Sequence, residues 1–169
     1  MAKRKKATHP EERKAELIAG LVAVRKKIVA SASALPADKR ETVFLGSWSV
    51  MDLLAHLAGW DLANLEASKE IARGKLPSFY AHHDRDWATY NASLIARHKR
   101  SDLDAQIQEV RGTHRKLIAE LKSLPAEDLD RDKGIRRGSY RVTLGRLLRA
   151  ELNDEEDHLA QIEAFAKTD

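Results

Sequence analysis

The residues best suited to chemistry in this chain lie near its C-terminal end, between positions 147 and 165. If this stretch is helical, at about 100° per residue, one line along it is apolar at both ends and polar in the middle. The line runs through Leu147, Glu151, Asp154, His158, Gln161 and Phe165. Leucines and an isoleucine flank it, so the polar side chains fall at or beside buried positions. A carboxylate and an imidazole one turn apart at such positions need partners.

Two kinds of chemistry are compatible with Asp154 and His158. They can form a buried hydrogen-bonded network that ties helices together. They can also form a site in which a histidine acts as a general base and the carboxylate orients it. Glu151 and Gln161 extend the line by one turn on each side, and either hold a ligand in place or reach out to solvent at the edge of the stripe.

A second candidate, His56, lies at the edge of another apolar stripe. Leu53 and Trp60 are its neighbours at helical spacing, so its ring can face the interior and still reach a cavity. His114 lies within a third apolar stripe that faces the same interior, and its simpler interpretation is a histidine packed in the core with one nitrogen hydrogen-bonded. Side chains with wide aromatic faces and one polar group could line a pocket for an organic molecule, and this set comprises Trp48, Trp60, Tyr80, Trp87, Tyr90 and Asn91.

Four long amphipathic segments must position these residues, and each begins with a helix-capping pattern. The first cap spans Thr8 to Glu11, the second Ser49 to Asp52 and the third Ser101 to Asp104, while Thr143 caps the last segment. A shorter helix is predicted from Trp87 to about Ile95. No stretch alternates with the period of a strand. The sequence therefore predicts an all-α fold, with a four-helix bundle as its architecture.

Charge and composition narrow the functions further. The chain has 30 basic and 26 acidic residues, and four of the basic ones lie in the first six positions. The remainder is balanced, so we do not expect nucleic acid to be a partner, whether through this tail or through the loop at 131–141. Cysteine is absent, so a metal would need histidine and carboxylate ligands. Nucleotide-binding glycine loops and nucleophile elbows are missing too.

Neither a signal peptide nor an apolar run of membrane-spanning length is found, so we expect a cytoplasmic protein without a membrane partner. Its length favours one domain. We predict a flexible basic tail at 1–8 and a single helical domain at 9–169.

One motif resembles a known family. The stretch SWSVMDLLAHLAGWD at 47–61 is similar to the start of the second helix in the DinB-like four-helix-bundle superfamily, and to its ClbS/DfsB branch in particular. Segments at 87–91, 117–129, 143–148 and 158–162 add to the likeness. The resemblance implies an up-down-down-up bundle with a long crossover between the second and third long helices, which the segment from Gly74 to Arg100 would provide.

The resemblance also implies a candidate metal site. Many DinB-like proteins hold a metal with one histidine on the second helix and a pair of histidines four residues apart on the fourth. These positions fall on His56, Asp154 and His158, with a carboxylate where a histidine is common. Two histidines and a carboxylate remain a valid ligand set for Zn, Ni, Mn or Fe. The alternative is that Asp154 replaces the metal by pairing with both histidines.

The function expected from these observations is that of a small enzyme with a pocket between helices. It would be a hydrolase or detoxification enzyme acting on a small electrophilic organic molecule, or a thiol-dependent transferase as in other DinB-like proteins. His56, Asp154 and His158 would be its catalytic residues. The alternative is a non-catalytic module that binds or sequesters a small molecule, with a structural His/Asp network and helix faces that form a homodimer.

Overall fold

Four long helices form the body of the computed structural model, which describes residues 9–82 and 86–168. They are α1 (Pro10–Ala34), α3 (Val50–Ala72), α5 (Leu103–Ser123) and α6 (Leu144–Ala166). Shorter helical elements are α2 (Ala37–Arg40), η1 (Ser78–His82), α4 (Trp87–His98) and η2 (Ala126–Asp128). The predicted all-α bundle is confirmed. The predicted tail at 1–8 lies outside the described residues.

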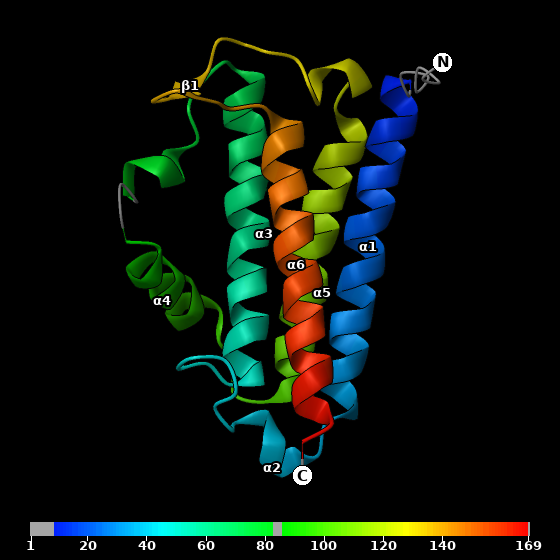
Figure 1. Cartoon of the computed structure of the whole chain (residues 1–169), viewed down its shortest axis with the longest axis vertical. Helices are drawn as coiled ribbons and strands as arrows, with labels where there is room; N and C mark the ends of the chain where they lie inside the picture. The colour runs from blue at the N-terminus through cyan, green and yellow to red at the C-terminus, as the bar shows by residue number, and fades with distance from the viewer. Residues whose placement is uncertain (1–8, 83–85, 169) are drawn as a thin grey trace, which may run out of the picture.

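The bundle has the topology that the resemblance implied. In Figure 1, α1 and α6 run in one direction along the long axis, and α3 and α5 run in the other. Because α3 and α5 are consecutive long helices and parallel, the chain must return along the outside of the bundle between them. The crossover contains η1 and α4, and α4 packs alongside α3. The up-down-down-up arrangement is therefore confirmed.

The helices begin at or close to the predicted caps. The Ser49 hydroxyl accepts a hydrogen bond from the backbone N–H of Asp52, and the Thr143 hydroxyl accepts one from that of Arg146. The third long helix begins one residue later than predicted, because the Asp102 carboxylate accepts the N–H of Ala105 at 2.8 Å. At the start of α1, His9 is the capping residue.

A small hairpin was not predicted. Two short antiparallel strands, β1 (Arg136–Arg137) and β2 (Tyr140–Arg141), pair in the connection between α5 and α6. Strands of this length show no alternation that a sequence pattern could reveal. Gly138 at the turn has a φ of 58°, a left-handed conformation that glycine adopts without strain. The hairpin lies at the α3 C-terminal end of the bundle (Figure 1).

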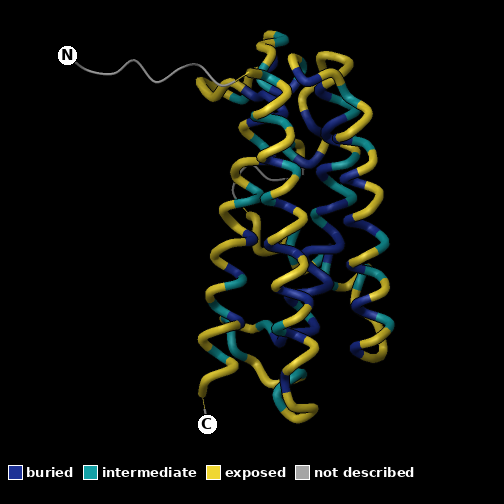
Figure 2. The backbone as a smooth tube through the Cα atoms, turned by 90° about the vertical axis from the view of Figure 1, so that its right-hand side faces the viewer, coloured by how far each residue is buried: buried dark blue, intermediate teal, exposed yellow. Residues whose placement is uncertain are grey.

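The four helices do not approach one another equally. Close packing joins α3 to α5 and α1 to α6, whereas α1 meets α5, and α3 meets α6, at few positions. Buried residues follow the inner side of each helix in Figure 2. The apolar core has two parts, one around Leu54 and Val110 and the other around Leu21 and Leu117. A layer of buried polar side chains lies between these parts along the helices: Arg25, Asp61, Asn64, Thr113, His114 and Glu155.

Helix α4 lies close against α3 at one glycine. A Cβ on Gly59 would come within 2.7 Å of the Leu94 Cβ, so only glycine permits this approach. At the next residue of α3, the Trp60 indole donates a hydrogen bond of 3.0 Å to the side chain of Asn91, which lies about one turn before Leu94 on α4. Both contacts fix the crossover against the bundle. Among the described residues, no helix is long and apolar enough to cross a membrane.

Candidate functional site

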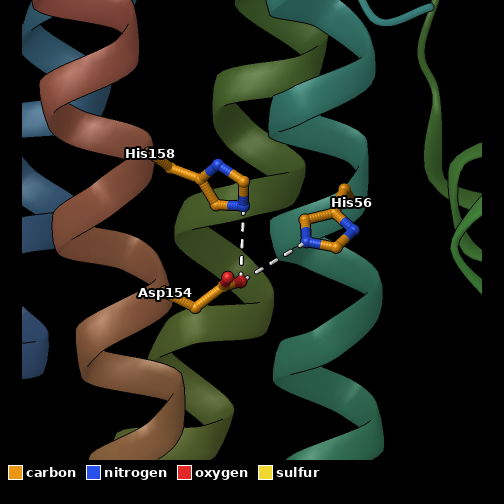
Figure 3. A group of neighbouring side chains, drawn as sticks. All are labelled: His56, Asp154 and His158. Carbon is orange, nitrogen blue, oxygen red and sulfur yellow. Dashed lines mark ion pairs between the residues drawn. The ribbon is translucent and has the colours of Figure 1, made fainter. Parts of the chain in front are cut away.

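Helices α3 and α6, which contact each other at few positions, bring His56, Asp154 and His158 together. Figure 3 shows the Asp154 carboxylate on α6 between the His158 ring, one turn further along the same helix, and the His56 ring on α3. Asp154 Oδ2 lies 3.3 Å from His158 Nε2 and 3.9 Å from His56 Nε2. The two imidazole rings are 5.4 Å apart and nearly perpendicular. Both histidines are buried, whereas the Asp154 side chain is 55% exposed.

The protonation of His158 follows from its two neighbours. Its Nδ1 lies 2.8 Å from the amide oxygen of Gln161, which can only accept, so Nδ1 donates. In the neutral ring, Nε2 would then turn a lone pair toward the Asp154 carboxylate, and a proton or a cation is needed between them. Burial opposes a charged ring, but Asp154 and Gln161 outweigh it and raise the pKa of His158. The two histidines in turn lower the pKa of Asp154.

His56 has the opposite character. Burial lowers the pKa of its imidazole, and the nearby Asp154 does not compensate fully. Its ring packs on Trp48 with a centroid distance of 4.7 Å. Its Nδ1 is buried without a hydrogen-bond partner, and the 3.9 Å gap from Nε2 to Asp154 is longer than a hydrogen bond. The cluster therefore holds one histidine that favours the neutral form and one that favours the protonated form.

A cavity of about 630 Å³ opens beside this cluster, between α3, α6, the crossover and the hairpin. Of the residues predicted to line a pocket, Trp60, Trp87, Asn91 and Glu151 do so, together with His56 and Asp154. Tyr80, also predicted for this role, lines it too, whereas five further lining residues were not predicted: Phe79, Arg137, Tyr140, Leu147 and Ala150. The Arg137 guanidinium lies 4.7 Å from the centre of the Tyr80 ring. The cavity thus has aromatic walls on one side and acidic and imidazole groups on the other.

Glu151 is half-buried on the wall of this cavity, one turn before Asp154. Burial, and then the nearby carboxylates of Glu155 and Asp61, raise its pKa to about 8. Near neutral pH the carboxyl group is thus mainly protonated and can donate. Asp154, one turn along the helix, is ionised, because its pKa is lowered. On the same helix, the Glu151 carboxyl group is therefore suited to donate a proton, and the Asp154 carboxylate is suited to accept a hydrogen bond or bind a cation.

Three predicted pocket residues lie elsewhere. Trp48 packs behind His56, and Tyr90 contacts the Trp60 ring at 5.4 Å, but neither is among the residues that line the cavity. His114 belongs to the buried polar layer, where its Nδ1 lies 3.3 Å from an Asp61 carboxylate oxygen. Helix α5 is on the far side of α3 from the cavity, so its stripe faces a different part of the interior.

The buried polar layer is organised around Arg25 of α1. Its guanidinium donates to both oxygens of Asp61, at 2.7 and 3.1 Å, and to both oxygens of Glu155, at 3.0 and 2.7 Å. Thr113 also donates to Asp61. We call Arg25, Asp61, His114 and Glu155 the arginine cluster. The spacing of Arg25 from Leu21 and Ile28 placed it within the apolar stripe, and this signal could have identified it.

The chain offers two groups of side chains that resemble metal sites. Ligand atoms of Asp61, His114 and Glu155 lie within 4.8 Å of one another, but Arg25 already donates to both carboxylates there. Ligand atoms of His56, Asp154 and His158 lie equally close, and within the described part of the chain no lysine or arginine forms a salt bridge with Asp154. An outer hydrogen bond such as that from His158 to Gln161 is common for metal-binding histidines. The residues of this second group fit a divalent ion.

Comparison with known proteins places these features in a family. A profile of the DinB superfamily matches residues 20–162. No curated protein matches the chain. The structure is similar to that of the colibactin self-resistance protein ClbS in complex with double-stranded DNA, with a TM-score of 0.76 and 14% identity over 92% of this chain and 96% of that one. It is also similar to an uncharacterised protein from Escherichia coli UTI89, with a TM-score of 0.71 and 15% identity over 91% and 92% of the two chains.

The DNA in the ClbS structure contradicts our expectation that nucleic acid is not a partner. That expectation used the charge of the whole chain outside the tail, which averages over faces of opposite sign. Seven basic and four acidic residues lie between positions 126 and 149, so one end of the bundle is positive although the whole is balanced. The predicted resemblance to the DinB-like superfamily is confirmed, and the fold is similar to that of ClbS. The chain belongs to the DinB superfamily.

Proposed function

We propose that this protein binds a small electrophilic organic molecule in the cavity between α3, α6 and the crossover, and hydrolyses it with the groups of the adjacent cluster. The observation that carries the proposal is the cavity itself. Aromatic rings line one wall of it, and His56, Glu151 and Asp154 line the other. Flat apolar walls suit an organic ligand, and convergent titratable groups suit its conversion.

The shifts in pKa indicate which residues accept a proton and which donate one in the proposed reaction. His56 favours the neutral form, so its Nε2 can take a proton from water as the oxygen attacks the electrophilic carbon. Glu151 and His158 favour the protonated form, so either can give a proton to the departing or ring-opened atom. Asp154 lies between the two histidines, and through its 3.3 Å contact with Nε2 it orients the His158 ring. The net result is addition of water to the substrate.

The same three residues would hold a divalent metal. Such an ion, bound by His56, Asp154 and His158, would act as a Lewis acid and make water a better nucleophile at neutral pH. Gln161 would keep the His158 ring in the orientation that leaves Nε2 free for a ligand. Glu151 would remain the donor of a proton on the cavity wall.

Turnover of a test electrophile distinguishes this enzyme from a binding module. With 4-nitrophenyl acetate and styrene oxide as probes, we expect His56→Ala to lower hydrolysis about 100-fold while the far-ultraviolet circular dichroism is unchanged. His98→Ala, on α4, is the control and should keep full activity. Metal analysis of purified protein and zinc titration test the ion. Binding of both probes by the wild type without turnover would favour a sequestering module.

DNA is a second candidate ligand, and the hairpin end of the bundle favours it. Arg131 and Arg141 have side chains that are 55% and 53% exposed, and Arg146 lies 4.3 Å over the exposed ring of Tyr140. Arg137 and Tyr140 of the same hairpin also line the cavity, so DNA bound there would lie at its mouth. We expect Arg141→Glu with Arg146→Glu to weaken binding of a 20-base-pair duplex, measured by fluorescence anisotropy, by about tenfold.

A further inference from the structure

A second cavity, of about 650 Å³, opens between α1 and α5, the other pair of neighbouring helices that contact each other at few positions. The cavity of about 630 Å³ described above, here called the aromatic cavity, lies beside α3 and α6. The second cavity lies on the opposite side of the bundle, between the other two long helices. Neither the proposed reaction nor the DNA candidate uses any residue that lines it. We call it the α1–α5 cleft.

Positive charge without partners surrounds the mouth of this cleft. Lys26 of α1 and Arg111 and Arg115 of α5 are exposed and line it. Within the described part of the chain, none of these three side chains forms a salt bridge, and the lining includes no acidic residue. Two exposed arginines elsewhere, Arg136 and Arg149, do have carboxylate partners. The mouth therefore offers three cations to an anionic group.

The interior of the cleft has a different character. Its apolar lining includes Val22, which is 43% exposed, and Val29, two turns further along α1. At the bottom lie His114 and Arg25. His114 is 92% buried, and its Nδ1 donates to the Asp61 carboxylate. Its Nε2 is buried and has no hydrogen-bond partner, and in the tautomer that carries its hydrogen on Nδ1 this nitrogen is an unused acceptor. An unsatisfied buried nitrogen is costly, and a ligand with an O–H or N–H group would satisfy it.

We propose that the α1–α5 cleft binds a small organic anion. Its carboxylate or phosphate group lies at the mouth between Lys26, Arg111 and Arg115. Its apolar body packs against Val22 and Val29. A hydroxyl or amide N–H at its far end donates to His114 Nε2. This site is independent of the reaction in the aromatic cavity.

The probe for this site is 8-hydroxyoctanoate, which carries an anionic group, an apolar chain and a terminal donor. We expect calorimetric titration to show binding by the wild type, and Arg111→Glu with Arg115→Glu to weaken it by about tenfold or more. The matched control is Lys27→Glu with Lys116→Glu, which reverses two exposed charges on the same helices outside the cleft lining. This control should change the affinity less than about twofold. No binding by the wild type would overturn the proposal.

Two related compounds test the parts of the ligand. Octane-1,8-diol lacks the anion and should bind about tenfold more weakly, whereas octanoate lacks the donor and should bind about fivefold more weakly. Equal binding of all three compounds would mean that the cleft recognises only apolar surface, and would overturn the proposal.

Tryptophan fluorescence shows which cavity the probe occupies. Trp60 and Trp87 line the aromatic cavity, Trp48 packs on His56, and the chain has no other tryptophan. Binding in the α1–α5 cleft should leave the emission unchanged, and quenching by 8-hydroxyoctanoate would place it in the wrong cavity. A 20-base-pair duplex whose binding depends on Arg111 and Arg115 and displaces 8-hydroxyoctanoate would show that these arginines serve DNA, and would also overturn the proposal.

Discussion

The arginine cluster and the His56–Asp154–His158 cluster meet at neighbouring residues of α6, yet they differ in how completely their groups are paired. Glu155 and Asp61 have side chains that are 1% exposed, and each receives two hydrogen bonds from Arg25. Asp154, the residue before Glu155, is 55% exposed and stands 3.9 Å from His56. His56 Nδ1 has no partner at all. The carboxylates and the guanidinium of the arginine cluster are paired with one another, and only His114 Nε2 there lacks a partner, whereas the other cluster is open and incomplete.

This difference separates structural from functional polar groups in the same core. A buried network in which the guanidinium and the carboxylates use one another's donors and acceptors fixes how helices pack, and these charged groups have nothing left for a ligand. An open cluster beside a cavity keeps atoms available, at some cost in stability. Residues 154 and 155 of α6 point about 100° apart, so one helix serves both clusters.

The largest effect should come from breaking the arginine cluster. Arg25→Met removes the guanidinium and leaves Asp61 and Glu155 buried without a counter-charge, so we expect the free energy of unfolding to fall by about 3–5 kcal/mol. Urea denaturation followed by circular dichroism measures it. Lys26→Met, at the next and exposed position of α1, should change it by less than about 0.5 kcal/mol. A similar small change for Arg25→Met would mean that the network does not hold the bundle together.

Much of the fold could be predicted from the sequence because its signals are local. Apolar spacing located the four long helices, and Ser49 and Thr143 marked two of their starts as predicted. The convergence of His56 with Asp154 and His158 came from the family resemblance. The hairpin was missed because two-residue strands carry no period.

The partners of Arg25 could not be predicted in the same way. Asp61 and Glu155 are 36 and 130 residues away from it in the chain, and no pattern within a helix indicates which distant carboxylate a buried arginine will meet. The walls of the aromatic cavity were missed in part for a related reason. Phe79, Arg137 and Tyr140 come from short connections, whose positions depend on how they pack against the finished bundle.

An intermediate effect should appear at Glu151, which lies between the two clusters. Its pKa rises from 4.5 to about 8 on folding, so the folded state binds more protons than the unfolded state between these values. The contribution of this group to stability is thus complete below about pH 4.5 and is lost as pH rises through 8. Glu151→Gln should remove this loss and make the variant more stable than the wild type at pH 9 by about 1–2 kcal/mol, less than the full shift because the side chain is half-buried.

Urea denaturation of Glu151→Gln at pH 5, 7 and 9 provides the measurement. The difference from the wild type should grow steadily across this range. Glu163→Gln, an exposed position on the same helix, is the control and should show no such growth. If the wild type and Glu151→Gln lose stability in parallel as pH rises, the Glu151 carboxyl group is ionised throughout and cannot donate a proton at neutral pH.

The smallest effect on stability, with a large effect on binding, should come from the open cluster. Asp154→Asn keeps the shape of a half-exposed side chain, so we expect the free energy of unfolding to change by less than about 0.5 kcal/mol. Loss of the carboxylate should nevertheless weaken zinc binding at least about tenfold in calorimetry, and should lower the pKa of His158 because Asp154 raises it. Asp157→Asn, exposed on the same turn of α6, should leave both unchanged. Destabilisation by several kcal/mol, as for Arg25→Met, would instead make the open cluster a second structural network, with Asp154 standing where a metal would otherwise be.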